Sequence, residues 1–265
     1  MRLKILLISV LLIIFVGVLA LGTLHWNESV AAAGSENDDD RTTPSLPDDS
    51  PNKFELSEQE KRAIMLAKNW SLKAQEALKS KMKSNQPFLM GIVGSQSLGK
   101  DVNGWSVQLK TKMEQAFGSD VLQVKIFEYD SIRSSKFIKY SDYQEVADFK
   151  PDMVLFEPFT LNDNGYVPVE SEEKNFEKFQ AALGDAVMIL QPPHPIYQST
   201  YYPRQVAAIK KFAESKSITY LDHWTAWPDP ATAAVKEDLT PSQSAPNEKG
   251  HKLWAEYLEK YFIAE

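Results

Sequence analysis

Apolar and polar positions follow two different periods along the chain from residue 55 onward. Some short stretches are apolar at nearly every position, as expected for strands that are buried on both faces. We predict these strands at residues 88–93, 121–127, 152–156, 186–191 and 219–222. Between them, apolar residues recur every three or four positions, which predicts helices at residues 57–83, 105–117, 171–183, 203–215 and 248–262. Strands that alternate with helices favour a three-layer α/β/α sandwich with a five-stranded parallel sheet.

The first 22 residues differ from the rest of the chain because they contain an uncharged apolar run at residues 5–21. The run is close to the length that a helix needs to cross a bilayer, and Arg2 and Lys4 precede it. We interpret residues 1–22 as a transmembrane anchor or a signal segment, with the domain outside the membrane. The small-residue cleavage site at residues 31–33 lies well beyond the run, so both outcomes stay open: a single-pass membrane protein or a secreted one.

Residues 23–54 form a predicted acidic linker, because residues 34–53 are rich in Asp, Pro and Ser and nearly free of apolar side chains. The globular domain is expected at residues 55–265, where Ser57 and Glu60 match a capping box at the first helix. The chain has no cysteine, which excludes thiol catalysis and cysteine metal sites. A net charge of −7 gives no indication of a nucleic-acid partner.

In a parallel sheet, functional residues are expected just after the strands, at their carboxyl ends. Residues 94–100 follow the first strand and match the spacing of a phosphate-binding loop, G-x-x-x-x-G-K. Such a loop needs Ser or Thr after the lysine and a helix that begins there, whereas Asp101 follows here, with Gly104 close behind. We therefore expect no nucleotide binding. The alternative is a nucleophilic serine at the strand-to-helix turn, either Ser95 or the less well spaced Ser97.

Ser95-x-x-x-Gly99 resembles the first block of the SGNH (GDSL-type) hydrolase family, G-D-S-x-x-x-G, although Gly94 stands where the family has aspartate. Asn162-Asp163, after the third strand, resembles the family's third block, G-x-N-D. The resemblance implies a flavodoxin-like fold with Ser95 as nucleophile. It also implies an oxyanion site formed by Asn162 and the backbone N–H groups of Ser95 and Gly99. On their own, these residues are also ordinary turn residues.

The family's fifth block, D-x-x-H-P before the closing helix, is where this sequence departs from the resemblance. Pro246 and Gly250 keep the frame, but Ala245 stands at the histidine and Ser242 at the aspartate. Neither residue accepts a proton at neutral pH, and a serine hydroxyl without a base is a weak nucleophile. A catalytic site therefore needs a histidine from elsewhere in the domain.

Three histidines could supply this base. His194 follows the fourth strand in a proline-braced loop, His223 follows the fifth strand, and His251 lies in the first turn of the last helix. We expect His194 to act, because a rigid loop positions a side chain at little entropic cost. His223 and Asp222 are candidate partners at the same edge of the sheet. The sequence leaves the carboxylate partner of His194 open among Asp222, Glu157 and Asp238.

Together with the expected export segment, the resemblance to the SGNH family implies an extracytoplasmic serine esterase that acts on ester or O-acetyl groups of envelope glycans, without a metal or an organic cofactor. The alternative is a catalytically degenerate SGNH domain that binds a glycan or a partner protein. A hydrogen bond between a histidine and the Ser95 hydroxyl would favour the enzyme. Several aromatic residues either line a sugar pocket or fill the core beneath the loops. They are Tyr197, Tyr201, Tyr202, Trp224 and Trp227.

Overall fold

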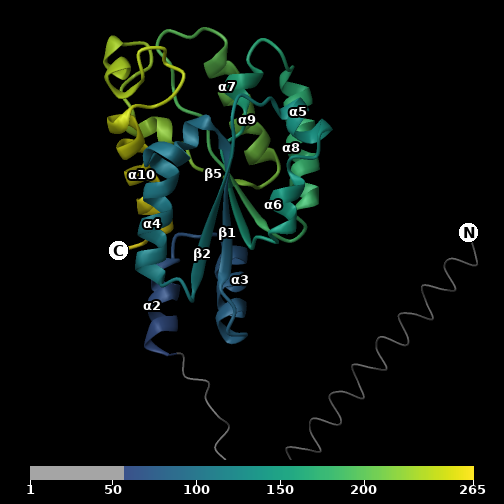
Figure 1. Ribbon diagram of the computed structural model, residues 1–265, viewed down its shortest axis with the longest axis vertical. Helices are drawn as coiled ribbons and strands as arrows, with labels where there is room; N and C mark the ends of the chain where they lie inside the picture. Colours follow the sequence, from purple (N-terminus) through teal and green to yellow (C-terminus); the bar gives the residue numbers. More distant parts are fainter. Residues whose placement is uncertain (1–56) are drawn as a thin grey trace, which may run out of the picture. The chain divides into compact units, whose positions relative to one another are not determined.

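The computed structural model describes residues 57–265. These residues contain a five-stranded parallel sheet with the strand order β2-β1-β3-β4-β5 (Figure 1). This is the flavodoxin-like order, so the predicted fold class is confirmed. The strands are β1 (Phe88–Ser95), β2 (Leu122–Tyr129), β3 (Met153–Phe156), β4 (Val187–Leu190) and β5 (Thr219–Tyr220).

The central strands are buried on both faces. On β3, Met153 and Leu155 pack into one part of the core, whereas Val154 and Phe156 pack into the other. This alternation follows from the two-residue repeat of a strand. It gives the domain two core layers, one on each face of the sheet, and it explains why the strands read as continuous apolar runs.

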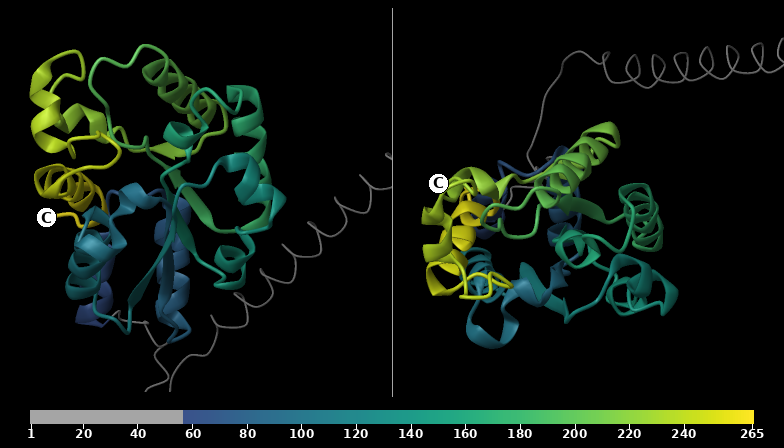
Figure 2. Two further views of the ribbon diagram at one scale, coloured as in Figure 1. Left: turned by 45° about the horizontal axis from the view of Figure 1, so that its top comes forward. Right: turned by 90° about the horizontal axis from the view of Figure 1, so that it is seen from above.

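Helices cover both faces of the sheet. One core layer receives side chains from α2 (Glu58–Leu66), α3 (Leu72–Lys83), α4 (Trp105–Phe117) and α10 (Glu248–Phe262). The other receives side chains from α5 (Ser134–Lys139), α6 (Gln144–Asp148), α8 (Val169–Ala182) and α9 (Tyr202–Ser215). Figure 2 shows the C-terminal helix, in yellow, and the green helices of the second group on opposite sides of the sheet. Short helical turns complete the fold: η1 (Gln96–Leu98), η2 (Lys100–Val102), α7 (Thr160–Asp163), η3 (His223–Ala226) and η4 (Ala233–Asp238).

The N-terminal helical region differs from the prediction. A single helix was expected at residues 57–83, but the chain forms α2 and α3 with a break between them. Trp70 lies in this break, where it is buried and donates its indole N–H to the Phe262 carbonyl at 3.0 Å. Ser71 then caps α3, so the break seats an aromatic ring in the core. The capping box predicted at Ser57 is confirmed at the start of α2.

Strands β1, β3 and β4 are neighbours in the sheet, so the residues that follow them meet at one edge. These residues are the turn after Ser95, the residue Glu157, and the segment 191–201 that leads to α9. The carboxyl edge therefore brings together three of the loops that were expected to carry function.

No helix within residues 57–265 is long and apolar enough to cross a bilayer. The anchor or signal segment expected at residues 1–22 and the linker expected at residues 23–54 lie outside the described residues. Both stay predictions.

Candidate functional site

A tight turn after β1 carries both candidate serines. Ser95 ends β1 and caps η1, because its hydroxyl oxygen accepts a hydrogen bond from the Ser97 N–H at 3.2 Å. Gly99 ends η1 with a φ of +70°, in the left-handed region that favours glycine. A Cβ at Gly99 would lie 2.7 Å from His251 Cε1 and 2.8 Å from Gly104 Cα. Gly99 is therefore required both for the turn and for its close packing against α10.

The Ser95 side chain lies against a buried carboxyl group. Glu157, the residue after β3, accepts the Ser95 backbone N–H at 2.6 Å, and its other oxygen lies 3.2 Å from the Ser95 hydroxyl. Glu157 is fully buried, and this burial raises the pKa of its carboxyl group to about 8. The group is therefore mostly protonated at neutral pH, and as a neutral acid it can donate to Ser95 Oγ.

Gly94 makes room for this carboxyl group. A Cβ at Gly94 would lie 2.4 Å from Glu157 Oε2 and 2.9 Å from Glu157 Cβ. The aspartate that the family has at position 94 is therefore incompatible with the Glu157 side chain in this place. A side chain at position 94 and the buried Glu157 side chain would occupy the same space, so the glycine at position 94 is what allows Glu157 to be buried here.

His194 hydrogen-bonds to Ser97 and not to Ser95. Its Nδ1 lies 3.1 Å from Ser97 Oγ, and its Nε2 lies 3.1 Å from the Gln243 carbonyl oxygen. A carbonyl oxygen only accepts hydrogen bonds, so Nε2 carries the proton and Nδ1 accepts from the Ser97 hydroxyl. The sequence predicts that His194 pairs with Ser95, but in the structure it pairs with Ser97. The Ser95 side chain points toward Glu157, whereas the turn directs Ser97 toward the loop between β4 and α9.

Both members of the Ser97–His194 pair are buried, with 2% of Ser97 and 0% of His194 exposed. Burial lowers the pKa of His194 to about 4, and the nearby His251 acts in the same direction. At neutral pH the imidazole is uncharged, which is the form that accepts a proton. Because the charged form is costly in this place, His194 is a weak base.

Gln243 orients the histidine through its backbone. It lies in the segment 242–245, which corresponds to the family's D-x-x-H block. The Gln243 carbonyl accepts from His194 Nε2, and the Gln243 carboxamide oxygen accepts the Tyr197 N–H at 2.7 Å. Tyr202 adds a third constraint, since its hydroxyl donates to the His194 carbonyl at 2.9 Å. This segment has no histidine of its own, and it holds a histidine from another loop.

The predicted oxyanion donors are engaged elsewhere. Asn162 lies in α7 and donates from its carboxamide to the Ile132 carbonyl at 2.8 Å. The Gly99 N–H donates to the Gln96 carbonyl at 3.1 Å, and the Ser95 N–H donates to the buried carboxyl group described above. The structure does not bring these three donors toward the hydroxyl of the serine that contacts histidine. An oxyanion site built from them requires a rearrangement when substrate binds.

The candidate partners from β5 do not contact His194. His223 Nε2 donates to the Pro192 carbonyl at 2.8 Å, and the Trp227 indole N–H donates to His223 Nδ1 at 2.9 Å. Burial lowers the pKa of His223 to about 3. Asp222 forms an ion pair with Lys210 at 2.9 Å. Both residues therefore stabilise the fold around β5, and no carboxylate in residues 57–265 hydrogen-bonds to His194.

The last histidine also has a structural partner. His251 Nδ1 accepts the Trp105 N–H at 3.2 Å and so fixes the start of α4. In the part of the chain that the structure describes, no group of three or more His, Asp or Glu side chains is arranged to hold a metal ion.

Two groups at this site were not assigned their roles from the sequence. The sequence leaves Glu157 as one possible partner of His194, whereas in the structure it binds Ser95. A glutamate directly after the all-apolar run at residues 152–156 is a signal of a buried carboxyl group that could have been used. Gln243 had no such signal, because its contribution to His194 comes from the main chain.

The sheet order and the serine turn at the carboxyl end of β1 define the class: the domain has the α/β/α fold of the SGNH (GDSL-type) hydrolases. It is similar to a lipolytic protein of the G-D-S-L family from Desulfitobacterium hafniense DCB-2, with a TM-score of 0.54 and 18% identity. That match covers 66% of this chain and 99% of the other.

Two further solved structures are similar to this domain in fold. An acetylxylan esterase from Geobacillus stearothermophilus has a TM-score of 0.55 at 13% identity, over 67% of this chain and 94% of the other. A lipase/acylhydrolase from Enterococcus faecalis has a TM-score of 0.54 at 15% identity, over 65% of this chain and 93% of the other. At these identities the likeness establishes the fold and not the activity. No protein-family model and no curated protein matches the chain.

Proposed function

We propose that this chain is a carboxylic ester hydrolase in which Ser97 is the nucleophile and His194 the general base. The 3.1 Å hydrogen bond between Ser97 Oγ and His194 Nδ1 carries the proposal, because it places the hydroxyl proton against a neutral imidazole at the ligand edge of the sheet. The Gln243 carbonyl takes the orienting role that an aspartate has in a triad. The fold shared with lipases and esterases supports the same reaction class.

The reaction proceeds in two acyl-transfer steps. Ser97 Oγ bonds to the ester carbonyl carbon while its proton passes to His194 Nδ1. The bond to the alcohol oxygen then breaks, and the alcohol leaves with that proton. Water attacks the acyl-serine and gives a proton to Nδ1, the acid leaves, and Ser97 Oγ takes the proton back.

The proposed substrate is an acetyl ester on an envelope glycan. Only 2% of Ser97 is exposed, which favours a small acyl group over a long chain. One protein of the same fold is an acetylxylan esterase, which supports an acetylated sugar as the alcohol part. The predicted export segment at residues 1–22 would place the domain outside the membrane, where such glycans occur.

Hydrolysis of p-nitrophenyl acetate by purified variants tests the proposal. Ser97→Ala and His194→Gln are expected to lower kcat by about 100-fold or more, since each removes one half of the pair. Ser95→Ala is expected to keep activity within about tenfold of the wild type, because the Ser95 hydroxyl contacts Glu157 and the Ser97 backbone N–H but not His194. Ser244→Ala is the matched control, an exposed serine in the loop that carries Gln243. Equal rates for wild type and Ser97→Ala would rule out the proposed nucleophile.

A second candidate function is binding without catalysis. The engaged Asn162 carboxamide and the engaged Gly99 N–H favour it, because neither is free to stabilise an oxyanion. In that case the wild type hydrolyses p-nitrophenyl acetate no faster than the His194→Gln variant. Retained binding of a glycan by both proteins would then support a degenerate SGNH domain.

A further inference from the structure

A cavity lies between the end of α7 and the start of α9. Its volume is about 520 Å³, within the range of small-molecule sites. Its walls come from two segments that are far apart in the sequence, residues 164–169 and residues 201–205. The second segment continues the loop that carries His194, so the cavity and the Ser97–His194 pair are joined by one short stretch of chain.

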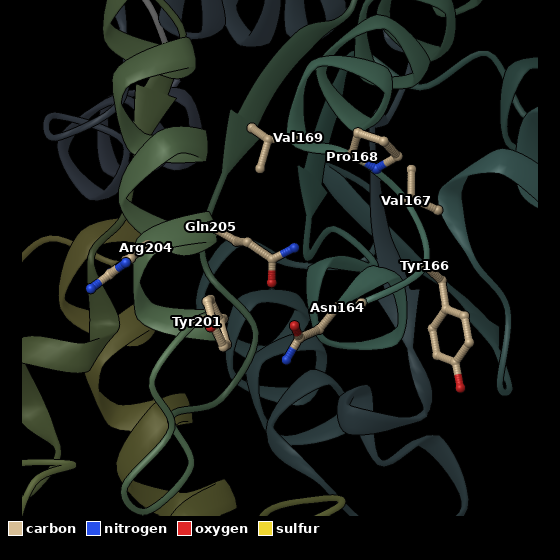
Figure 3. A pocket seen from close by; sticks show the side chains of 9 residues that line it. Asn164, Tyr166, Val167, Pro168, Val169, Tyr201, Arg204 and Gln205 are labelled. Atoms are coloured by element: carbon tan, nitrogen blue, oxygen red, sulfur yellow. The ribbon is translucent and has the colours of Figure 1, made fainter.

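Two carboxamides face one another across this cavity. Figure 3 shows the side chains of Gln205, from α9, and Asn164, from the opposite segment, pointing toward each other. Gln205 Oε1 is buried and has no hydrogen-bond partner in the described residues. A buried acceptor without a partner is unfavourable, and a ligand hydroxyl would satisfy it. A carboxamide both donates and accepts, as a hydroxyl does, so the pair suits a ligand rich in hydroxyl groups.

The aromatic and apolar parts of the wall are also complementary to a sugar. Tyr201 lines the cavity and is 69% exposed, so its ring is open to a ligand. Tyr166 is equally exposed, but the Arg133 guanidinium already covers its ring at 3.6 Å from the centroid. Val167 and Pro168 form part of the apolar wall. The C–H groups on one face of a pyranose carry partial positive charge and contact the negative face of an aromatic ring.

We infer that this cavity is a saccharide-binding subsite, in which a pyranose ring stacks on Tyr201 while its hydroxyl groups bond to Gln205 and Asn164. Of the five aromatic residues considered for a sugar pocket, Tyr201 is the one that lines this cavity, whereas Tyr202 is fully buried in the core. The identity of the ligand rests on the glycan substrate of the proposed function, but binding at this subsite does not require catalysis.

Isothermal titration of the full protein with xylohexaose, cellohexaose and chitohexaose tests the subsite. At least one of these oligosaccharides is expected to bind the wild type. Tyr201→Ala and Gln205→Ala are each expected to weaken the dissociation constant by about tenfold or more. Tyr140→Ala is the matched control, because Tyr140 is 63% exposed and does not line the cavity, and it binds as the wild type does. Circular dichroism establishes that each variant is folded.

Ser97→Ala separates this inference from the proposed catalysis. It is expected to bind the oligosaccharide with unchanged affinity even though its kcat for ester hydrolysis falls by about 100-fold or more. Absence of binding to all three oligosaccharides overturns the subsite, and so does a Tyr201→Ala variant that binds as tightly as Tyr140→Ala. Binding of an extended penta-alanine peptide in place of any saccharide also overturns it. If the wild type hydrolyses no ester but binds an oligosaccharide, and Tyr201→Ala abolishes that binding, the subsite is supported and the esterase proposal is rejected.

Discussion

Replacing Glu157 by glutamine should stabilise the domain at mildly alkaline pH. The carboxyl group of Glu157 is fully buried, and it contacts the Ser95 N–H at 2.6 Å and the Ser95 hydroxyl at 3.2 Å. In glutamine, the carbonyl oxygen can accept the same N–H and the amide can donate to the same hydroxyl. The substitution therefore keeps the shape and the contacts of the protonated acid and removes only its ability to ionise.

The size of the effect follows from the raised pKa. Burial moves the pKa of Glu157 from the ordinary 4.5 to about 8 in the folded protein. Between these values the unfolded chain loses a proton that the folded chain keeps, so the free energy of unfolding falls as pH rises and levels off above about 8. Between pH 6.5 and 8 the fall is roughly 2 kcal/mol for one such group. Glu172, whose pKa burial also raises to about 8, adds a similar fall in the same window.

Urea unfolding, followed by tryptophan fluorescence at several pH values between 6.5 and 8, measures this slope. The wild type should lose about twice as much stability over the window as Glu157→Gln or Glu172→Gln, and the double variant should lose little. The exposed Glu58→Gln is the control and should follow the wild type. If Glu157→Gln loses stability in parallel with the wild type, the carboxyl group is not protonated in the fold and the reasoning is wrong.

Two further predictions follow from the site. Esterase activity should be constant near neutral pH and should decline as pH falls through about 4, because only the neutral form of His194 accepts the proton of Ser97. A pH profile of kcat/KM measures this decline. A decline centred near pH 6.5 would contradict the lowered pKa of His194. Gly99→Ala should destabilise the domain by roughly 3 kcal/mol or more, since its φ is +70° and its Cβ would clash with His251. Gly184→Ala, at a φ of +62° with nothing within 4 Å, should cost only about 1 kcal/mol in the same thermal unfolding assay, and equal costs would show that the clash is relieved.

The fold was largely predictable because its determinants are local. Helices α4 and α10 begin and end at the predicted residues, since an apolar stripe runs through each. The parallel sheet was predictable because continuous apolar strands alternate with amphipathic helices. The break between α2 and α3 was not predictable, because the helical spacing continues through it. The break arises because Trp70 is buried against the end of α10, and these two parts of the chain are 192 residues apart in the sequence.

The candidate site was predictable in its location but not in its contacts. The sequence predicts functional residues in the turn after β1 and in the loop after β4, and these two segments contact each other through Ser97 and His194. Which serine reaches His194 depends on the direction of two side chains within one 3₁₀ turn, and Ser97 and His194 are 97 residues apart in the chain. The position of Asn162 depends in the same way on the short helix α7, which has no repeat long enough to be recognised.

The group that orients His194 is a main-chain carbonyl, that of Gln243, and not a side chain. Every residue type carries the same carbonyl group, so a change of side chain at position 243 keeps the contact with His194 as long as the backbone keeps its φ of +57°, although it gives up the side-chain contact with the Tyr197 N–H. An orienting group that comes from the main chain leaves no trace in a sequence motif. Other domains of this fold that have no histidine before the closing helix can therefore position a histidine from another loop in a way that only backbone geometry reveals.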